Sequence, residues 1–150
     1  MVNDARLRTK VYLKTYLDGA NLTKDDDSTE VRFIIAYADP NYSLVHIFND
    51  KAVDLVFCIG DPESQAVLDS DHYPIGYNEA VPITVWCINK ADITGTKLRW
   101  KAEAELRRIC ETYPEGSLRS LERLRDNDKN LGSTILYSRE FIMKYERDLT

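Results

Sequence analysis

The chain has 150 residues, of which 43% are hydrophobic and 30% charged, and its net charge at pH 7 is -5. This composition is typical of a soluble globular protein, and the length predicts one domain spanning residues 1–150. The acidic balance argues against a dedicated nucleic-acid binder, because phosphate binding requires a surplus of Lys and Arg. No apolar run approaches the roughly 20 residues that cross a bilayer. The first four residues lack a basic region followed by an apolar core, so we expect no secretory signal.

Residues 3–17 predict an opening helix that Asn3 or Asp4 caps and that ends at Gly19. The residues that can share its apolar face are Ala5, Val11 or Tyr12, Tyr16 and Leu17. Residues 23–29, which include three consecutive acids at 25–27, predict a solvated loop. They lack the alternate spacing, the Gly and the closing Glu of an EF-hand loop, so no metal is expected there.

Three β-rich runs follow, at residues 31–37, 44–48 and 53–59. The third is nearly all apolar, which predicts a central strand covered on both faces. Residues 61–80 show no sustained periodicity and contain Pro62, Pro74 and Gly76. They predict a long excursion with one helical turn at 63–68, and long ordered loops usually serve binding.

Residues 81–89 predict another strand, with Pro82 near its start or at an edge. Residues 97–113 predict an amphipathic helix that lies on the sheet. Its apolar stripe is Leu98, Ala102, Leu106, Ile109 and Tyr113, and its outer face is Arg99, Lys101, Glu103, Glu105, Arg107 and Arg108. Gly95 lies just before this helix, and we interpret it as part of the capped start of the helix and not of a phosphate-binding loop.

The C-terminal third predicts a long strand over residues 134–147, because a mostly apolar set of positions alternates strictly with a more polar set. One parity carries Ile135, Tyr137, Arg139, Phe141, Met143 and Tyr145. Such a strand spans about 46 Å, so we expect it to project past its sheet or to bend, and to offer an edge to a partner. Residues 117–125 fit a helix or a strand, and we favour a strand because the final strand needs a neighbour. The predicted fold is α+β, a single mixed or antiparallel sheet with the N-terminal helix and the second amphipathic helix packed on one face.

No catalytic, cofactor-binding or metal site is expected. The two histidines, His46 and His72, have neither metal-ligand spacing nor a neighbouring Cys pair. The three cysteines, Cys58, Cys87 and Cys110, lie in apolar segments, which predicts buried free thiols in a reducing compartment. A Cys–His pair with Cys58 or Cys87 and a pair among the carboxylates remain formal alternatives; these carboxylates are Asp54, Asp61, Glu63, Asp69 and Asp71.

Residues 69–79 are the best functional candidate, because Tyr73, Ile75 and Tyr77 alternate there among acids. Aromatic and apolar side chains on such a segment are typical anchors of protein–protein contacts. The alternative is that they fold under the loop. The predicted interface comprises Tyr73, Ile75, Tyr77, Tyr137, Arg139 and Phe141.

Three features together resemble the tail-terminator (tail-completion, neck) proteins of tailed phages. They are the opening helix, the run from Ala80 to Trp86 that leads through Thr94-Gly95-Thr96-Lys97 into the second helix, and the closing strand at 141–146. The resemblance implies a virion protein without enzymatic activity, assembled in the host cytoplasm. Its subunits form a homo-oligomeric ring, typically hexameric, which caps the tail tube protein and docks on the head-tail connector. DNA passes through such a ring without specific binding, and the negative net charge suits that passage.

Two other classes remain open. One is a different α+β interaction module, such as an adaptor or immunity-type protein, for which a monomer with a single aromatic patch would be expected. The other is a small enzyme, which would require a deep pocket holding His72 or a carboxylate pair.

Overall fold

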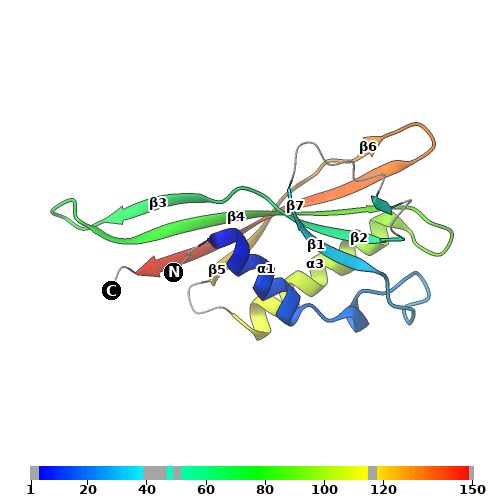
Figure 1. The fold of residues 1–150 in the computed structure, drawn as a ribbon, viewed down its shortest axis with the longest axis horizontal. Helices are drawn as coiled ribbons and strands as arrows, with labels where there is room; N and C mark the ends of the chain where they lie inside the picture. Colours follow the sequence, from blue (N-terminus) through cyan, green and yellow to red (C-terminus); the bar gives the residue numbers. More distant parts are fainter. Residues whose placement is uncertain (1–3, 39–46, 49–51, 115–117, 149–150) are drawn as a thin grey trace.

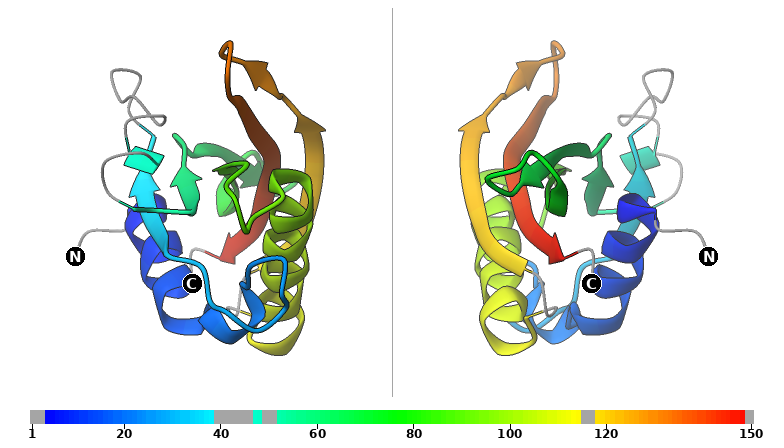
Figure 2. Two further views of the ribbon diagram at one scale, coloured as in Figure 1. Left: turned by 90° about the vertical axis from the view of Figure 1, so that its right-hand side faces the viewer. Right: turned by 90° about the vertical axis from the view of Figure 1, so that its left-hand side faces the viewer.

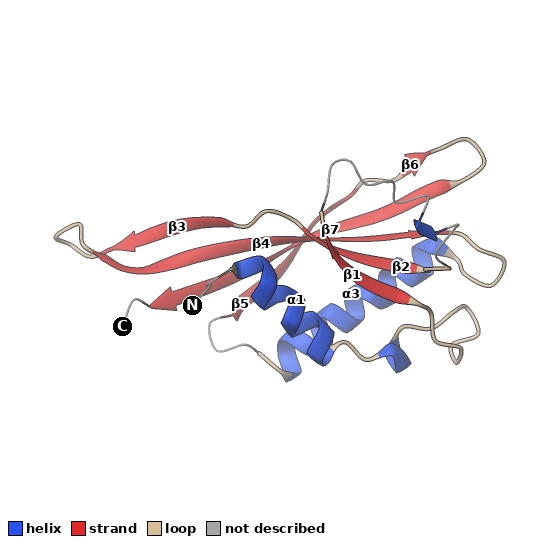
Figure 3. Cartoon of the chain, viewed as in Figure 1, coloured by secondary structure: helices blue, strands red, loops and turns tan. Residues whose placement is uncertain are grey.

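The computed structural model describes residues 4–38, 47–48, 52–114 and 118–148. Its centre is a mixed sheet of seven strands with two helices on one face (Figures 1 and 3). The strands are β1 (Phe33–Tyr37), β2 (Leu55–Ile59), β3 (Glu63–Leu68), β4 (Pro74–Ile88), β5 (Leu118–Asp126), β6 (Lys129–Asn130) and β7 (Ile135–Asp148), and the helices are α1 (Ala5–Tyr16) and α3 (Gly95–Thr112). The predicted α+β class is therefore confirmed.

The sheet has the order β1-β2-β4-β7-β5, and β4 and β7 form its spine. These two strands pair antiparallel from Gly76 opposite Asp148 to Ile88 opposite Leu136. β2 and β3 lie end to end along the other side of β4, because β2 pairs with residues 83–87 of β4 and β3 with residues 74–80. β1 runs parallel to β2, and β5 runs antiparallel to β7.

Helix α1 begins after Asp4, whose carboxylate accepts a hydrogen bond from the Arg6 backbone N–H at 2.9 Å. Its buried residues are Ala5, Thr9, Tyr12 and Leu13. Of the two predicted core residues, Tyr12 therefore faces the sheet and Val11 faces outward. Tyr16 is more exposed than predicted and stacks on Tyr113, with 4.6 Å between ring centroids.

Helix α3 carries the predicted buried stripe from Leu98 to Ile109, but its predicted outer face is partly wrong. Arg99 and Glu105 are buried. Glu105 lies under a short 3-10 helix, η1, at Gly19–Asn21 and accepts a hydrogen bond from the Asp18 backbone N–H at 2.6 Å. Arg99 binds Asp128, with 2.5 Å between Nη1 and Oδ1. Segments that are remote in sequence therefore cover both flanks of the helix.

The acidic loop at 25–27 packs against this helix and is not merely solvated. The Asp25 carboxylate accepts hydrogen bonds from the backbone N–H and the hydroxyl of Thr94, at 2.9 and 2.7 Å. The Thr94 backbone N–H at the start of α3 has no partner within the helix, so an acceptor there is stabilising. These bonds lower the pKa of Asp25. Asp27 binds Lys101 at 2.6 Å and fixes the loop from its other end.

The main core fills the space between the sheet and the two helices (Figure 2). On the opposite face a second cluster brings Ile47, Phe48 and Val53 over Val56 and Cys58 of β2. β2 is buried along its whole length, which confirms the prediction of a strand covered on both faces. The strand predicted at 44–48 lies mostly outside the described residues, as does His46, and Ile47 and Phe48 are helical.

The prediction for residues 61–80 was wrong. They form a β-hairpin in place of an irregular excursion with a helical turn, because β3 pairs with an extension of β4 that begins at Pro74. Pro82 consequently lies inside β4. Its carbonyl accepts a hydrogen bond from Gly60 N–H at 2.8 Å. The N and C=O of one strand residue point to the same side. The hydrogen-free nitrogen of Pro82 therefore faces the junction between β2 and β3, where no ladder bond is required.

Two C-terminal predictions are confirmed, the strand at residues 117–125 and the long strand at residues 134–147. The expectation that the long strand offers an edge to a partner was wrong for most of its length, because β7 pairs with β4 on one side and with β5 and β6 on the other. Residues 118–126 form the strand β5, which pairs with β7. β7 is as long as predicted, but it does not project alone, because β4 accompanies it over nearly its whole length. In the described chain, β3 is an edge strand that pairs with β4 alone.

Candidate interaction surface

The hairpin β3–β4 extends past the ends of both helices at the left of Figure 1. Its strands pair from Glu63 opposite Ala80 to Leu68 opposite Pro74. Asp69 closes the turn, because its carboxylate accepts hydrogen bonds from the backbone N–H groups of Asp71 and Tyr73, both at 2.9 Å. A local hydrogen-bond network therefore defines the tip of the hairpin.

The base of the hairpin is fixed to helix α1 by two ion pairs. Arg8 contacts both carboxylate oxygens of Glu79, at 2.8 and 2.9 Å, and this pair is largely shielded from solvent. Arg6 reaches Asp61 at 3.3 Å, where the carboxylate is almost fully exposed. The Arg8–Glu79 contact is the stronger of the two, because it is shorter and more shielded from solvent than the Arg6–Asp61 contact.

Apolar side chains are exposed over the outer part of the hairpin. Tyr73 is 68% exposed, Ile75 49% and Tyr77 39%, and Leu68 is exposed beside them. The prediction that the alternating residues are available for contact is therefore favoured over the alternative that they fold under a loop. Leu68 is not among the predicted contact residues, because the sequence predicts a helical turn at residues 63–68.

The hairpin is also acidic. Residues 52–89 contain six acids and no Lys or Arg. Five of the acids, Asp61, Glu63, Asp69, Asp71 and Glu79, belong to the hairpin or to its base. The sequence alone shows this charge pattern, and the structure adds that the acidic segment projects from the packed body. A partner that covers it must be neutral or basic.

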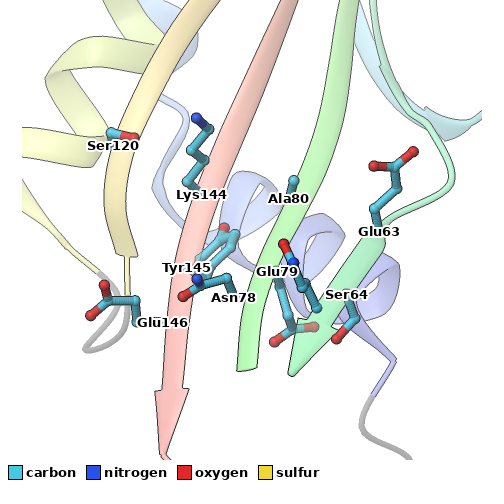
Figure 4. A pocket seen from close by; sticks show the side chains of 10 residues that line it. Glu63, Ser64, Asn78, Glu79, Ala80, Ser120, Lys144, Tyr145 and Glu146 are labelled. Carbon is cyan, nitrogen blue, oxygen red and sulfur yellow. The ribbon is translucent and has the colours of Figure 1, made fainter. Parts of the chain in front are cut away.

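An open groove of about 430 Å³ lies at the root of the hairpin, and Figure 4 shows side chains that line it. Four strands line it: Glu63, Ser64 and Gln65 of β3, Asn78, Glu79 and Ala80 of β4, Lys144, Tyr145 and Glu146 of β7, and Ser120 of β5. Lys144 binds Glu122 at 3.1 Å. Most of the lining residues are polar or charged, and the groove is open to solvent.

The other three predicted interface residues lie in the body of the protein. Phe141 is fully buried in the core, and Arg139 is buried in an ion-pair cluster with Asp126 and Glu103. Tyr137 is half-buried under Arg99. The structure does not bring these residues together with Tyr73, Ile75 and Tyr77. Phe141 and Arg139 are buried in the fold and do not form an exposed contact surface.

The described residues provide little for nucleophilic or metal chemistry. Burial raises the pKa of Cys58 and Cys110 to about 11 and that of Cys87 to about 12, so these thiols are protonated at neutral pH. His72 lies at the exposed hairpin tip with a φ of 64°. Among the residues that the structure describes, no three His, Cys, Asp or Glu side chains are placed to hold a metal ion.

Two of the candidate carboxylates, Asp54 and Asp69, have structural roles. Asp54 accepts hydrogen bonds from Lys90 and from the Arg32 backbone N–H, both at 2.8 Å. Asp69 closes the hairpin turn, as described above. These contacts fix single carboxylates in separate elements and do not assemble an acid–base pair.

No protein-family model matches the chain, and a search of curated proteins finds no match. No helix in the described part of the chain is long and apolar enough to cross a membrane. The structure is therefore that of an α+β protein with a packed body and an exposed hairpin, which is acidic and carries aromatic side chains.

Proposed function

We propose that this protein is a structural subunit of a homo-oligomeric ring that terminates the tail tube of a tailed phage and joins it to the head connector. The observation that carries the proposal is the hairpin β3–β4, whose strands leave the packed body with both faces exposed. The resemblance of the opening helix, of the strand leading into α3 and of the closing strand to tail-terminator proteins supplies the biological context.

The hairpin is a poor element for a protein that works alone. Beyond Gly76 the hairpin is a two-stranded ribbon, because the described pairing of β7 with β4 ends at Gly76 opposite Asp148. Such a ribbon is marginally stable in water unless a further layer covers it. Here the tip exposes Tyr73, Ile75 and Tyr77. These residue types gain most from burial in a protein–protein contact, because they carry large apolar area and few rotatable bonds. The design suits a subunit whose hairpin is covered by a neighbour after assembly.

The proposed partners follow from this role. The subunit contacts further copies of itself, typically six in a ring, and the ring contacts the tail tube protein and the connector. It resides in the virion after assembly in the host cytoplasm. It has no catalytic activity and no cofactor, consistent with the protonated thiols and the structurally engaged carboxylates of the described chain.

The net charge of -5 suits a ring through which DNA passes without adhering, because acidic side chains repel the phosphate backbone. Retention on DNA-cellulose tests this point at low salt, where electrostatic binding is strongest. We expect the protein in the flow-through. Salt-sensitive retention would contradict the proposed passage of DNA.

The ring itself is tested by light scattering over a concentration series, followed by negative-stain electron microscopy of the heaviest species. We expect a closed assembly of several copies with a central opening. A chain that stays monomeric at every soluble concentration would favour the adaptor class, and a catalytic activity lost on His72→Ala would favour the enzyme class.

A further inference from the structure

Helix α1 exposes apolar side chains on the side that faces away from the sheet. Leu7 is 47% exposed and Val11 56%, and they lie four residues apart, so they are neighbours on the helix surface. Lys10 lies three residues after Leu7, and Lys14 lies three residues after Val11, on the same side. An amphipathic surface helix usually presents polar side chains there. These four residues, called here the α1 patch, form a surface that is both apolar and basic.

The outer part of the hairpin β3–β4 has the complementary character. Residues 61–80 contain five acids and no Lys or Arg, whereas residues 5–17 of the opening helix contain four Lys or Arg and no acid. Opposite charges bring two surfaces together, and like charges keep them apart. Two hairpins, or two α1 patches, would therefore repel each other, and the charges favour contact of a hairpin with an α1 patch. The exposed apolar side chains of the hairpin are those of Leu68, Tyr73, Ile75 and Tyr77.

Within one subunit the base of the hairpin already binds this helix through charge. Glu79 contacts Arg8 at 2.8 Å, and Asp61 contacts Arg6 at 3.3 Å. These contacts use the two arginines of α1, whereas the two lysines belong to its outer side. The outer side of α1 therefore offers a second set of cations to a second acidic hairpin.

The face of the sheet on which the helices pack continues onto the hairpin. Tyr77 lies two residues before Glu79 in β4, and Glu79 reaches α1, so Tyr77 points to the side of the sheet that carries the helices. Ala66 of β3 is paired with Tyr77 and shares this face. The hairpin extends past both helices (Figure 1), and both residues are exposed. The hairpin therefore offers a further helix the same kind of surface that the body offers to α1.

The tip of the hairpin and the α1 patch do not meet within one subunit. β3 pairs with β4 from Glu63 to Leu68, and β4 continues into the body beside β7. This ladder directs the tip away from the helix that binds its base (Figure 1). A contact between the two complementary surfaces therefore joins two copies of the chain.

We propose that the outer part of the hairpin of one copy docks on the α1 patch of the next copy. The aromatic and apolar side chains of the hairpin pack on Leu7 and Val11, and its acids, among them the exposed Asp71 at the tip, lie beside Lys10 and Lys14. This inference rests on the proposed function and names the surfaces through which the subunits meet. The contact joins two different surfaces head to tail, as a closed ring of more than two copies requires.

Two variants, each lacking one side of the contact, test this docking by light scattering. The hairpin variant is Tyr73→Ser, Ile75→Ser, Tyr77→Ser. The patch variant is Leu7→Gln, Val11→Gln, in which Gln preserves helix propensity. For each variant alone we expect the concentration for half-assembly to rise by at least about 10-fold.

A mixture of the two variants gives the sharper result. The intact hairpin of the patch variant meets the intact α1 patch of the hairpin variant, and assembly stops there because the remaining two surfaces are altered. At concentrations where each variant alone is monomeric, we therefore expect a 1:1 dimer with twice the subunit mass of 17.3 kDa.

Further variants test the charge of the patch and control for the loss of apolar surface. Lys10→Glu with Lys14→Glu keeps both apolar residues, and we expect it also to raise the concentration for half-assembly by at least about 10-fold. Leu124→Gln with Leu131→Gln removes two similarly exposed side chains, from β5 and from the turn after β6. This control should assemble within about 2-fold of wild type. Circular dichroism and thermal unfolding of each variant establish that the monomer is folded.

The outcomes separate the docking from the ring. If either variant of the α1 patch assembles like wild type, or if the mixture of hairpin and patch variants stays monomeric, the docking is overturned while the ring stands. A wild-type protein that never assembles would overturn both the ring and the docking.

Discussion

β2 and β3 both pair with β4 along the same side, yet their environments are opposite. Every residue of β2 is buried, whereas five of the six residues of β3 are exposed. Both strands pair antiparallel with β4, but β2 also pairs with β1 on its other side, whereas β3 pairs with β4 alone in the described chain. The covering layers differ as well: the helices lie over one face of β2 and Ile47, Phe48 and Val53 over the other, whereas nothing in the described chain covers β3. Packing therefore stabilises the body, whereas the strand ladder extends the hairpin and leaves it available for contact.

The largest expected effect is in the body. Phe141→Ala removes a fully buried ring from the main core, and we expect it to lower the free energy of unfolding by about 3–5 kcal/mol. Ile75→Ala in the hairpin, where the side chain is half exposed, is the matched control and should cost less than about 0.5 kcal/mol. Urea unfolding of both variants measures the difference. Equal costs would remove the distinction between body and hairpin.

The next effect concerns the ion-pair cluster between α3 and the end of β5. Arg139 binds Asp126 at 2.7 Å and Glu103 at 2.8 Å, and it is buried. We expect Arg139→Leu to cost about 2 kcal/mol, less than a fully buried pair, because Arg99 still reaches Asp126.

Arg125→Leu is the control for this variant. Arg125 also contacts a carboxylate, that of Glu140, but its side chain is largely exposed. Its loss should cost at most about 0.5 kcal/mol. A cost for Arg125→Leu that matches that of Arg139→Leu would show that burial does not decide the strength of these pairs.

A smaller effect is expected where α1 meets the end of α3. The Tyr12 hydroxyl lies 2.9 Å from the Ile109 carbonyl and 2.8 Å from that of Tyr113. Tyr12→Phe keeps the ring and removes the hydroxyl donor, so we expect a loss of about 1 kcal/mol in chemical denaturation. Tyr73→Phe at the hairpin tip should be neutral. A neutral Tyr12→Phe would mean that ring packing alone joins the two helices.

The smallest effect is a dependence on pH. The folded-state pKa of Asp25 lies below its ordinary value of 3.8, chiefly because the Thr94 backbone N–H donates to the carboxylate. A depressed pKa contributes stability that is present above pH 3.8 and is lost as the pH falls through the folded-state value. We expect the thermal midpoint of Asp25→Asn to fall less than that of wild type between pH 5 and pH 3. An equal fall in thermal midpoint for the two proteins would contradict the assignment of this pH dependence to Asp25.

The sequence predicted the packed elements well because their periodicity reflects burial. β2, β7 and α3 were all identified from apolar runs or stripes, since one or both of their faces meet the core. β3 was missed for the converse reason. With both faces exposed, residues 63–68 have no apolar alternation, and their preference for helix or strand is weak. Pairing with the extension of β4 decides their conformation, and a local window does not contain that information.

The residues that we predicted to form the interface differ in their burial for the same reason. Tyr73, Ile75 and Tyr77 are exposed, whereas Phe141 and Arg139 are buried, although all five occur in alternating patterns. Alternation in a strand identifies two faces but does not show which face another layer covers. The burial of Arg99 and Glu105 has the same cause, because η1 and the turn after β5 come from distant parts of the chain.

The most direct measurement compares wild type with the triple variant Tyr73→Ser, Ile75→Ser, Tyr77→Ser by light scattering over one concentration series, with unfolding curves recorded in parallel. The account predicts that wild type assembles, that the variant remains monomeric, and that the two monomers unfold within about 0.5 kcal/mol of each other. A variant that assembles like wild type would contradict the role of the hairpin in contact between subunits. A variant that loses the folded body would contradict its independence from the core.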